Sequence, residues 1–288
     1  REFRTSDQLW RTVCGERDRI RDNYRELTLQ LREMDEPHRM LDLTCRAYDE
    51  GVAFRYTVPA QHGWTSVRVL RERSEFRFSR DHAAWATYSA QGEYQPVTLR
   101  TIRPGCERPL VVRRSDDCFI ALAEAKLVDY ARMKFGPVES GSFGVISLLD
   151  GPVESSLPLT TPWRVVMAAD RPGQLLENNF LLLNLNDPCA IEDPSWVQPG
   201  KVIREVSLTT QGGKDCVDFA VQQGLQYVEY DAGWYGHEYD ETSDATTVNV
   251  DPKRSKGPLD LREVIAYARE RGIGIILYVN QRALERQL

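Results

Sequence analysis

The sequence contains no apolar run that approaches the roughly 18 residues of a membrane-spanning helix. It also lacks a dense block of lysine and arginine, and its formal net charge is −6. Because binding to a phosphate backbone needs clustered basic side chains, we expect no nucleic-acid partner. No pair of its six cysteines has CxxC spacing, which argues against a zinc site. These absences are typical of a soluble globular protein.

The cysteines have two interpretations. Reduced residues in the protein core are favoured, since free cysteine behaves as a small apolar side chain. Cys106 and Cys118 could instead bridge a hairpin if the protein is exported. The chain begins at Arg1 rather than at a methionine, and no signal peptide is visible, which indicates little about its compartment.

Short strands separated by turn residues dominate the first two thirds of the chain. Gly51–Val58 alternates clearly, with Val52, Phe54 and Tyr56 on one face. Many short strands at this spacing predict a β-sandwich. The further expected strands are 65–70, 75–79, 109–112, 119–122, 144–149 and 163–168.

The end of this β-rich part carries turn and proline signals. We expect a short helix at 175–179 and interpret the apolar run Phe180–Leu183 as a buried strand. The proline-containing segment 193–200 then predicts a linker. The sequence therefore divides into a sandwich domain at 1–192, a linker at 193–200 and a second domain at 201–288.

Strands and helices alternate in the second domain. Strands are expected at 201–208, 225–231 and 273–279, with helices at 214–223 and 259–271. This alternation predicts a parallel sheet built from βαβ units. A (β/α)8 barrel needs eight such units and about three are present, so we expect an incomplete barrel.

Candidate substrate-binding residues follow the second of these strands. Asp231 and Trp234 stand at its C-terminal end, where barrel enzymes place their chemistry. The carboxylate suits sugar hydroxyls, and the indole suits the C–H face of a pyranose. The alternative is a capping aspartate and a packing tryptophan. Glu229 shares a side of the strand with Asp231 and is a weaker candidate.

For other polar residues near these strand ends, a structural role is at least as well supported as a role in the substrate pocket. Arg204 and Glu205 of the first strand favour a structural ion pair over a pocket role. Asn280 and Arg282, after the third strand, fit a loop cap as well as a pocket rim. The acidic loop 237–251 is by default a solvated loop, and a second calcium site there is the minor alternative.

Five motifs, in their order along the chain, resemble glycoside hydrolase family 97. They are Gly51–Tyr56 (GVAFRY), Ala123–Tyr130 (AEAKLVDY), Thr161–Met167 (TPWRVVM), Asn184–Ala190 (NLNDPCA) and Ser195–Lys201 (SWVQPGK). The resemblance implies an N-terminal β-super-sandwich, a catalytic (β/α)8 barrel, calcium dependence and hydrolysis of α-galactosidic or α-glucosidic bonds. It also implies a periplasmic or secreted bacterial protein. The catalytic acids are expected beyond Leu288, so no nucleophile or general acid is assigned.

The resemblance further implies that Glu124 is the calcium ligand contributed by the sandwich domain. An acid in the mostly apolar segment 121–125 needs an offset for its charge, and calcium prefers such oxygen ligands. The alternative is an exposed or salt-bridged strand glutamate.

Three functions remain open from the sequence. The favoured one is a calcium-dependent α-glycosidase that acts on an oligosaccharide or α-glycoside, with a slight preference for α-galactosides. The second is a non-catalytic carbohydrate-binding sandwich with a vestigial barrel. The third is an unrelated barrel enzyme for a phosphate-bearing substrate, against which the ordered motifs argue.

Overall fold

The computed structural model describes residues 1–139 and 141–287, which form two compact units. We call Arg1–Ala190 the sandwich unit and Ile191–Leu288 the α/β unit. Segment 193–200, the expected linker, contains no helix or strand.

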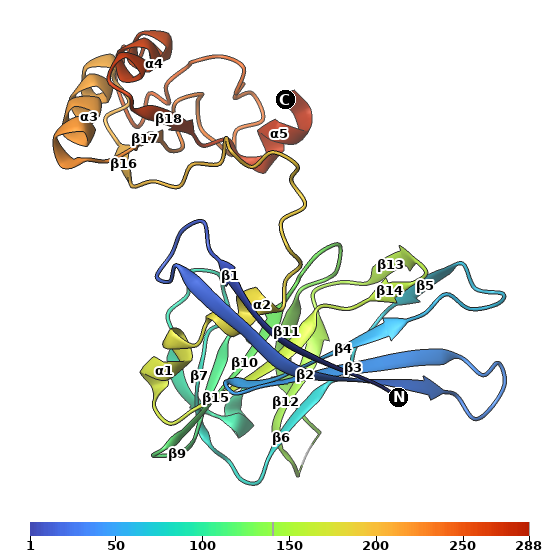
Figure 1. Ribbon diagram of the computed structural model, residues 1–288. Helices are drawn as coiled ribbons and strands as arrows, with labels where there is room; N and C mark the ends of the chain where they lie inside the picture. The colour runs from blue at the N-terminus through green and yellow to red at the C-terminus, as the bar shows by residue number, and fades with distance from the viewer. Residues whose placement is uncertain (140, 288) are drawn as a thin grey trace. The chain divides into compact units, whose positions relative to one another are not determined.

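A large antiparallel sheet forms the sandwich unit (Figure 1). Its strand order is β1-β2-β3-β4-β15-β10-β9-β7-β8, and β14 also pairs with β4. The bounds are β1 Glu2–Arg11, β2 Arg19–Arg32, β3 Met40–Tyr48, β4 Gly51–Val58, β7 Ala83–Ala86, β8 Gln95–Thr98, β9 Leu110–Ser115, β10 Cys118–Ala125, β14 Leu159–Thr160 and β15 Trp163–Ala169. A 3₁₀ turn, η1 Leu99–Thr101, follows β8.

Two smaller sheets complete the strands of this unit. One has the order β11-β12-β6, with β6 Glu75–Phe78, β11 Met133–Pro137 and β12 Phe143–Leu149. The other pairs β5 Ser66–Val69 with β13 Val153–Ser156. A core that includes Phe76, Phe135, Val112 and Leu122 joins the first of these sheets to the large sheet. The expected sandwich character is thereby confirmed.

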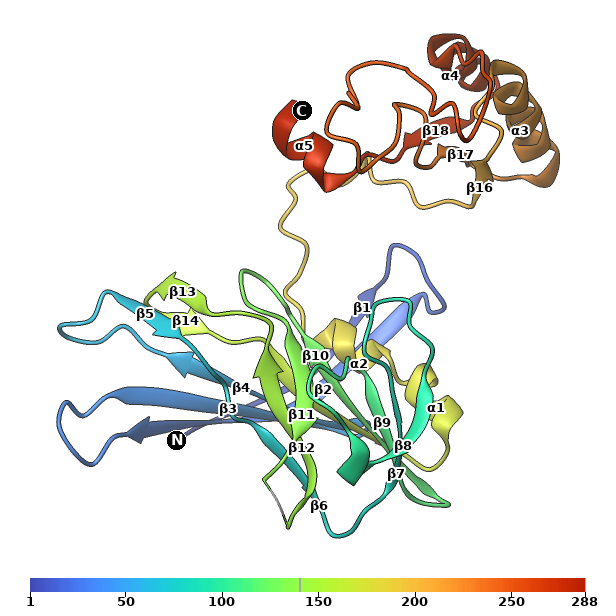
Figure 2. The ribbon, with the colours of Figure 1, turned by 180° about the vertical axis from the view of Figure 1, so that it is seen from behind.

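Two short helices lie on the other face of the large sheet (Figures 1 and 2). They are α1 Pro172–Glu177 and α2 Phe180–Asn184. The expectation of a buried strand at Phe180–Leu183 is wrong, because this segment makes one helical turn. Leu181 and Leu185, four residues apart, share the buried side of that turn, whereas Leu183 is exposed.

The α/β unit contains a three-stranded parallel sheet, β16-β17-β18. The strands are β16 Val202–Glu205, β17 Tyr227–Tyr230 and β18 Gly274–Leu277. The helices are α3 Thr210–Gln223, α4 Leu261–Glu270 and α5 Gln281–Gln287. Each of the two crossovers between neighbouring strands is a helix, which is the connection that parallel strands require.

Local sequence explains where α3 and α4 begin and end. The Thr209 side chain accepts a hydrogen bond from the Gly212 amide at 3.0 Å, and Gly224 ends α3 with a φ of 65°. Asp260 caps α4 by accepting from the Glu263 amide at 3.0 Å. Polar N-caps and a left-handed C-terminal glycine are the usual helix boundaries.

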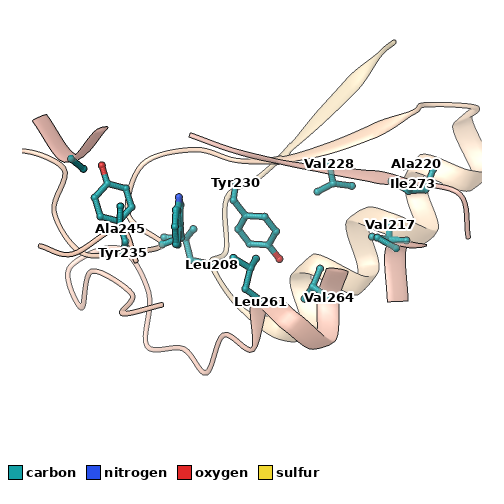
Figure 3. Close-up of a cluster of buried hydrophobic side chains, with 13 residues drawn as sticks. Leu208, Val217, Ala220, Val228, Tyr230, Tyr235, Ala245, Leu261, Val264 and Ile273 are labelled. Carbon is teal, nitrogen blue, oxygen red and sulfur yellow. The ribbon is translucent and has the colours of Figure 1, made fainter. Parts of the chain in front are cut away.

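Both helices pack on one face of the parallel sheet. Val228 and Tyr230 of β17 point into this core, and Figure 3 shows the Tyr230 ring directed towards Leu261 and Val264 of α4. Within the described residues no helix packs on the opposite face, which carries Val202 and Ile276 with exposed fractions of 47% and 42%. This sheet face is therefore open.

Candidate functional site

An ion pair between neighbouring strands stands at the C-terminal edge of the parallel sheet. Nη1 of Arg204 donates to Oδ2 of Asp231 at 2.7 Å, and the Ala232 amide donates to Oδ1 at 2.8 Å. The side chains of Arg204 and Asp231 are 54% and 32% exposed. The edge thus presents a partly open acceptor beside a guanidinium donor, a combination that can bind hydroxyl groups. The ion pair expected from the first strand joins Arg204 to Asp231 and not to Glu205.

Glu229 and Glu205 lie on opposite faces of the sheet. Glu229 is in register with Arg204, on the open face, and is half-buried. Glu205 is buried, and its carboxylate accepts from the amides of Ser207 and Leu208, each at 2.7 Å. The first strand ends at Glu205, earlier than expected, because this carboxylate closes a turn there.

Trp234 is 4% exposed and belongs to the core of the α/β unit. Its Nε1 donates to the Tyr278 carbonyl at 2.8 Å, and its ring packs edge-on against Tyr235 with the centroids 4.9 Å apart. The packing alternative describes this residue better than a sugar platform, because neither face of the indole is free. The proposed sugar contact of Trp234 stays a prediction that the geometry does not favour.

A polar cluster joins the loop after β17 to the segment after β18. The Tyr278 hydroxyl donates to Oε2 of Glu238 at 2.6 Å, and Nδ2 of Asn280 lies 3.4 Å from the same oxygen. The hydrogen bond to Glu238 raises the pKa of Tyr278. Nε of Arg282 donates to the Glu238 carbonyl at 3.2 Å. Sequence reasoning missed Tyr278 and singled out Glu238 only as a member of the acidic loop.

The other acids of this loop are bound to local donors. The amides of Thr242 and Thr246 donate to Asp240 and Asp244 at 2.8 and 2.9 Å. These interactions, from backbone amide and hydroxyl, lower the pKa of both aspartates. Across residues 1–139 and 141–287, no three His, Cys, Asp or Glu side chains are grouped to hold a metal ion. The second calcium site in this loop stays a prediction.

In the sandwich unit, Glu124 lies in a buried ionic network. It stands directly opposite Arg164 in the β10–β15 ladder and forms an ion pair with it. Nε of Arg108 approaches Oε2 of Glu124 at 2.9 Å, and the Met133 amide donates to both carboxylate oxygens at 3.1 and 3.2 Å. Arg164 also binds Glu72 through Nε at 2.7 Å.

This arrangement does not fit a free calcium ligand. Both oxygens of Glu124 already accept hydrogen bonds, and two guanidinium groups stand where a cation would be repelled. The salt-bridged alternative describes Glu124 in this structure. Sequence reasoning missed Arg164, Arg108 and Glu72, although a lone arginine in the apolar strand 163–169 was a usable signal.

The cysteines are all free within the described residues. Cys106 is fully buried, and burial raises the pKa of its thiol to about 11. The hairpin disulfide between Cys106 and Cys118 is therefore not formed in this structure. No helix in the described part of the chain has the length and apolar character needed to cross a membrane.

Two family models match the chain. The model described as Glycosyl-hydrolase 97 N-terminal matches residues 1–188, and the model described as Glycoside hydrolase 97 matches residues 196–288. Together they cover both units.

Curated relatives are matched over nearly the whole chain. A probable retaining alpha-galactosidase of Streptomyces bingchenggensis is 29% identical over 99% of this chain and 44% of its own length. A retaining alpha-galactosidase of Bacteroides thetaiotaomicron is 24% identical over 93% of this chain and 46% of its own. The chain thus spans less than half the length of these relatives.

A solved structure has the same fold. It is a glycoside hydrolase family 97 enzyme from Pseudoalteromonas sp. strain K8 in complex with acarbose, with a TM-score of 0.80 at 24% identity. The match covers 95% of this chain and 45% of that one.

Proposed function

Because the chain belongs to glycoside hydrolase family 97, we propose that it forms part of an enzyme that hydrolyses terminal α-galactosidic bonds. α-Galactosides are favoured over α-glucosides because the two curated relatives described above are named as alpha-galactosidases. Their names also favour a retaining reaction, in which two carboxyl groups stand about 5–5.5 Å apart across the scissile bond. In this proposal those catalytic acids lie outside residues 1–288.

The α/β unit supplies the first three βα units of a (β/α)8 barrel in this proposal. Its parallel strand order and helical crossovers support that assignment. The open face of the sheet, with Val202 and Ile276 exposed, supports it as well, because the inner face of a barrel is filled by side chains from other strands.

The Arg204–Asp231 pair is the main structural support for a substrate-binding site in this unit. It is partly exposed and stands at the strand ends where barrel enzymes bind substrate. Asp231 would accept a hydrogen bond from one sugar hydroxyl while Arg204 donates to a neighbouring oxygen, and Glu229 would line the open face below them. Calcium dependence and export from the cell stay predictions.

Replacement of Asp231 tests the site in the full-length enzyme. Asp231→Asn removes the charged acceptor and should lower kcat/KM for nitrophenyl α-galactoside by about 10–100-fold, the range expected for a lost hydrogen bond to a charged group. Asp215→Asn is the matched control, because Asp215 lies exposed on α3 and binds only the neighbouring Gln211 side chain among the described residues. Its kcat/KM should equal that of the wild type.

Two results would contradict the proposal at different points. Wild-type kcat/KM in Asp231→Asn would remove Asp231 from the site while leaving the enzyme assignment intact. Binding of galactosides and glucosides by the full-length protein without any turnover would instead favour the non-catalytic, carbohydrate-binding alternative.

A further inference from the structure

The charge of Glu124 is balanced by the chain itself. Its side chain is only 2% exposed, and its two oxygens form ion pairs with Arg164 and Arg108 and accept hydrogen bonds from the Met133 amide. A buried carboxylate is costly unless it is paired and hydrogen-bonded, and here both conditions are met. A divalent cation is not needed to make this position stable.

The two arginines differ in how firmly they are held. The Arg164 side chain is 0% exposed and binds Glu72 and Glu124 at once. Burial alone would lower the pKa of Arg164, but its hydrogen bonds and charge interactions with the two glutamates raise it. Arg164 is therefore a fixed, permanently charged part of the sandwich.

Arg108 is the outer member of the network. Its side chain is 19% exposed, and it reaches Glu124 through Nε and Glu107 through Nη1, at 2.9 and 3.2 Å. We propose that Arg108 is the resident counter-cation of Glu124 and supplies, from within the chain, the positive charge that a divalent cation would bring to that carboxylate. Calcium and Arg108 would then compete for Oε2 of Glu124.

Removal of Arg108 should take a cationic partner from Glu124 and leave Glu107, the other partner of Arg108, still paired. Glu107 also pairs with Arg132 at 3.1 Å and with Lys134 at 3.6 Å, so it keeps two cationic partners. Glu124 would keep Arg164 and the Met133 amide, which still donates to Oε2 at 3.2 Å, but Oε2 would lose its guanidinium partner. An Arg108→Gln variant thus removes the cation that opposes a metal at Oε2 without unbalancing the rest of the cluster.

Calcium binding to the full-length protein, freed of metal with a chelator, tests the proposal by titration calorimetry. The wild type should bind calcium weakly, and Arg108→Gln should bind it about tenfold more tightly because an opposing charge is gone. Arg108→Lys keeps the charge and should show no gain. Adding Glu124→Gln to Arg108→Gln should abolish the gain.

Arg132→Gln is the matched control, since Arg132 belongs to the same cluster and contacts Glu107 and Asp150 rather than Glu124. Its calcium affinity should equal that of the wild type. The proposal is overturned if Arg108→Gln binds calcium no more tightly than the wild type, or if Arg132→Gln gains as much.

The crystal structure of the wild-type enzyme, grown in excess calcium, tests the proposal even if Arg108→Gln does not fold. We expect Arg108 on Glu124 and no metal there. A metal ion on Glu124 with Arg108 still in contact would overturn the proposal. None of these readouts depends on substrate or turnover, so they are independent of the proposed α-galactosidase activity.

Discussion

Arg164 illustrates at the residue scale how a buried charge depends on its partners. Arg164 is fully buried and pairs with both Glu72 and Glu124. Without its guanidinium group, both carboxylates would lose their shared cationic partner. Removing one partner of a buried ion pair costs more than the pair contributes, because an uncompensated charge remains in the interior.

Arg164→Met should therefore lower the free energy of unfolding by about 3–5 kcal/mol. Urea unfolding of the full-length protein, followed by fluorescence, would measure it. Arg68→Met is the control, since Arg68 and its partner Glu154 are 63% and 69% exposed and such surface pairs contribute about 0–1 kcal/mol. Equal effects of the two substitutions would contradict the importance of the buried network.

The sequence alone indicates that Glu124 needs a partner but not which one. Its apolar surroundings in 121–125 are visible from the pattern. The partner depends on the β10–β15 register, which places Arg164 opposite, and on a loop that brings Arg108 close. Neither the register nor the loop path follows from local propensity, so the sequence favoured calcium and kept a salt bridge as the alternative.

At the scale of elements, the alternating strands were predictable and the polar ones were not. β4 occupies the predicted range 51–58, because apolar residues alternate there. β2, in contrast, has the sequence RIRDNYRELTLQLR, with charged residues at positions of both faces. Such a strand is stabilised by its pairing with β1 and β3 rather than by its own pattern.

Close packing between α3 and its sheet leads to an element-scale prediction. A Cβ on Gly213 would lie 2.1 Å from the Tyr230 hydroxyl oxygen and 2.9 Å from Val264 Cγ2. Gly213→Ala should destabilise the protein by about 1–3 kcal/mol, as overpacking does, although alanine favours helices. Thermal and urea unfolding would measure it.

Two further variants identify the cause. The Tyr230 hydroxyl is buried and has no hydrogen-bond partner in the described part of the chain, so Tyr230→Phe should change stability little and should reduce the cost of Gly213→Ala in the double variant. Gly173→Ala in α1 is the control, because its Cβ would meet only the flexible end of Arg171. A cost for Gly213→Ala that Tyr230→Phe leaves unchanged would rule out this contact as its source.

At the scale of the whole molecule, the chain has two compact units joined by an exposed segment. Residues 186–200 are all exposed and contain no helix or strand. Each unit is compact by itself. The proline and turn signals of 193–200 indicated this segment from the sequence, because such residues cannot continue either type of regular element.

Limited proteolysis should therefore cut the chain of residues 1–288 first within 186–200. Exposed segments without secondary structure are the preferred sites of proteolytic nicking. Chymotrypsin has a target at Trp196, which is 72% exposed, and mass spectrometry of the early fragments would locate the cut. An initial cut inside β10 or α3, with 186–200 intact, would contradict the division into two units.

The direct opposition of Glu124 and Arg164 in the β10–β15 ladder also bears on how the sandwich finds its pairing during folding. Side chains alternate between the two faces of a sheet, so sliding one strand by a single residue would turn one of these charges towards the wrong face. The displaced charge would then be buried without its partner across the ladder, which is costly. The ion pair thus favours the native β10–β15 register over a register shifted by one residue.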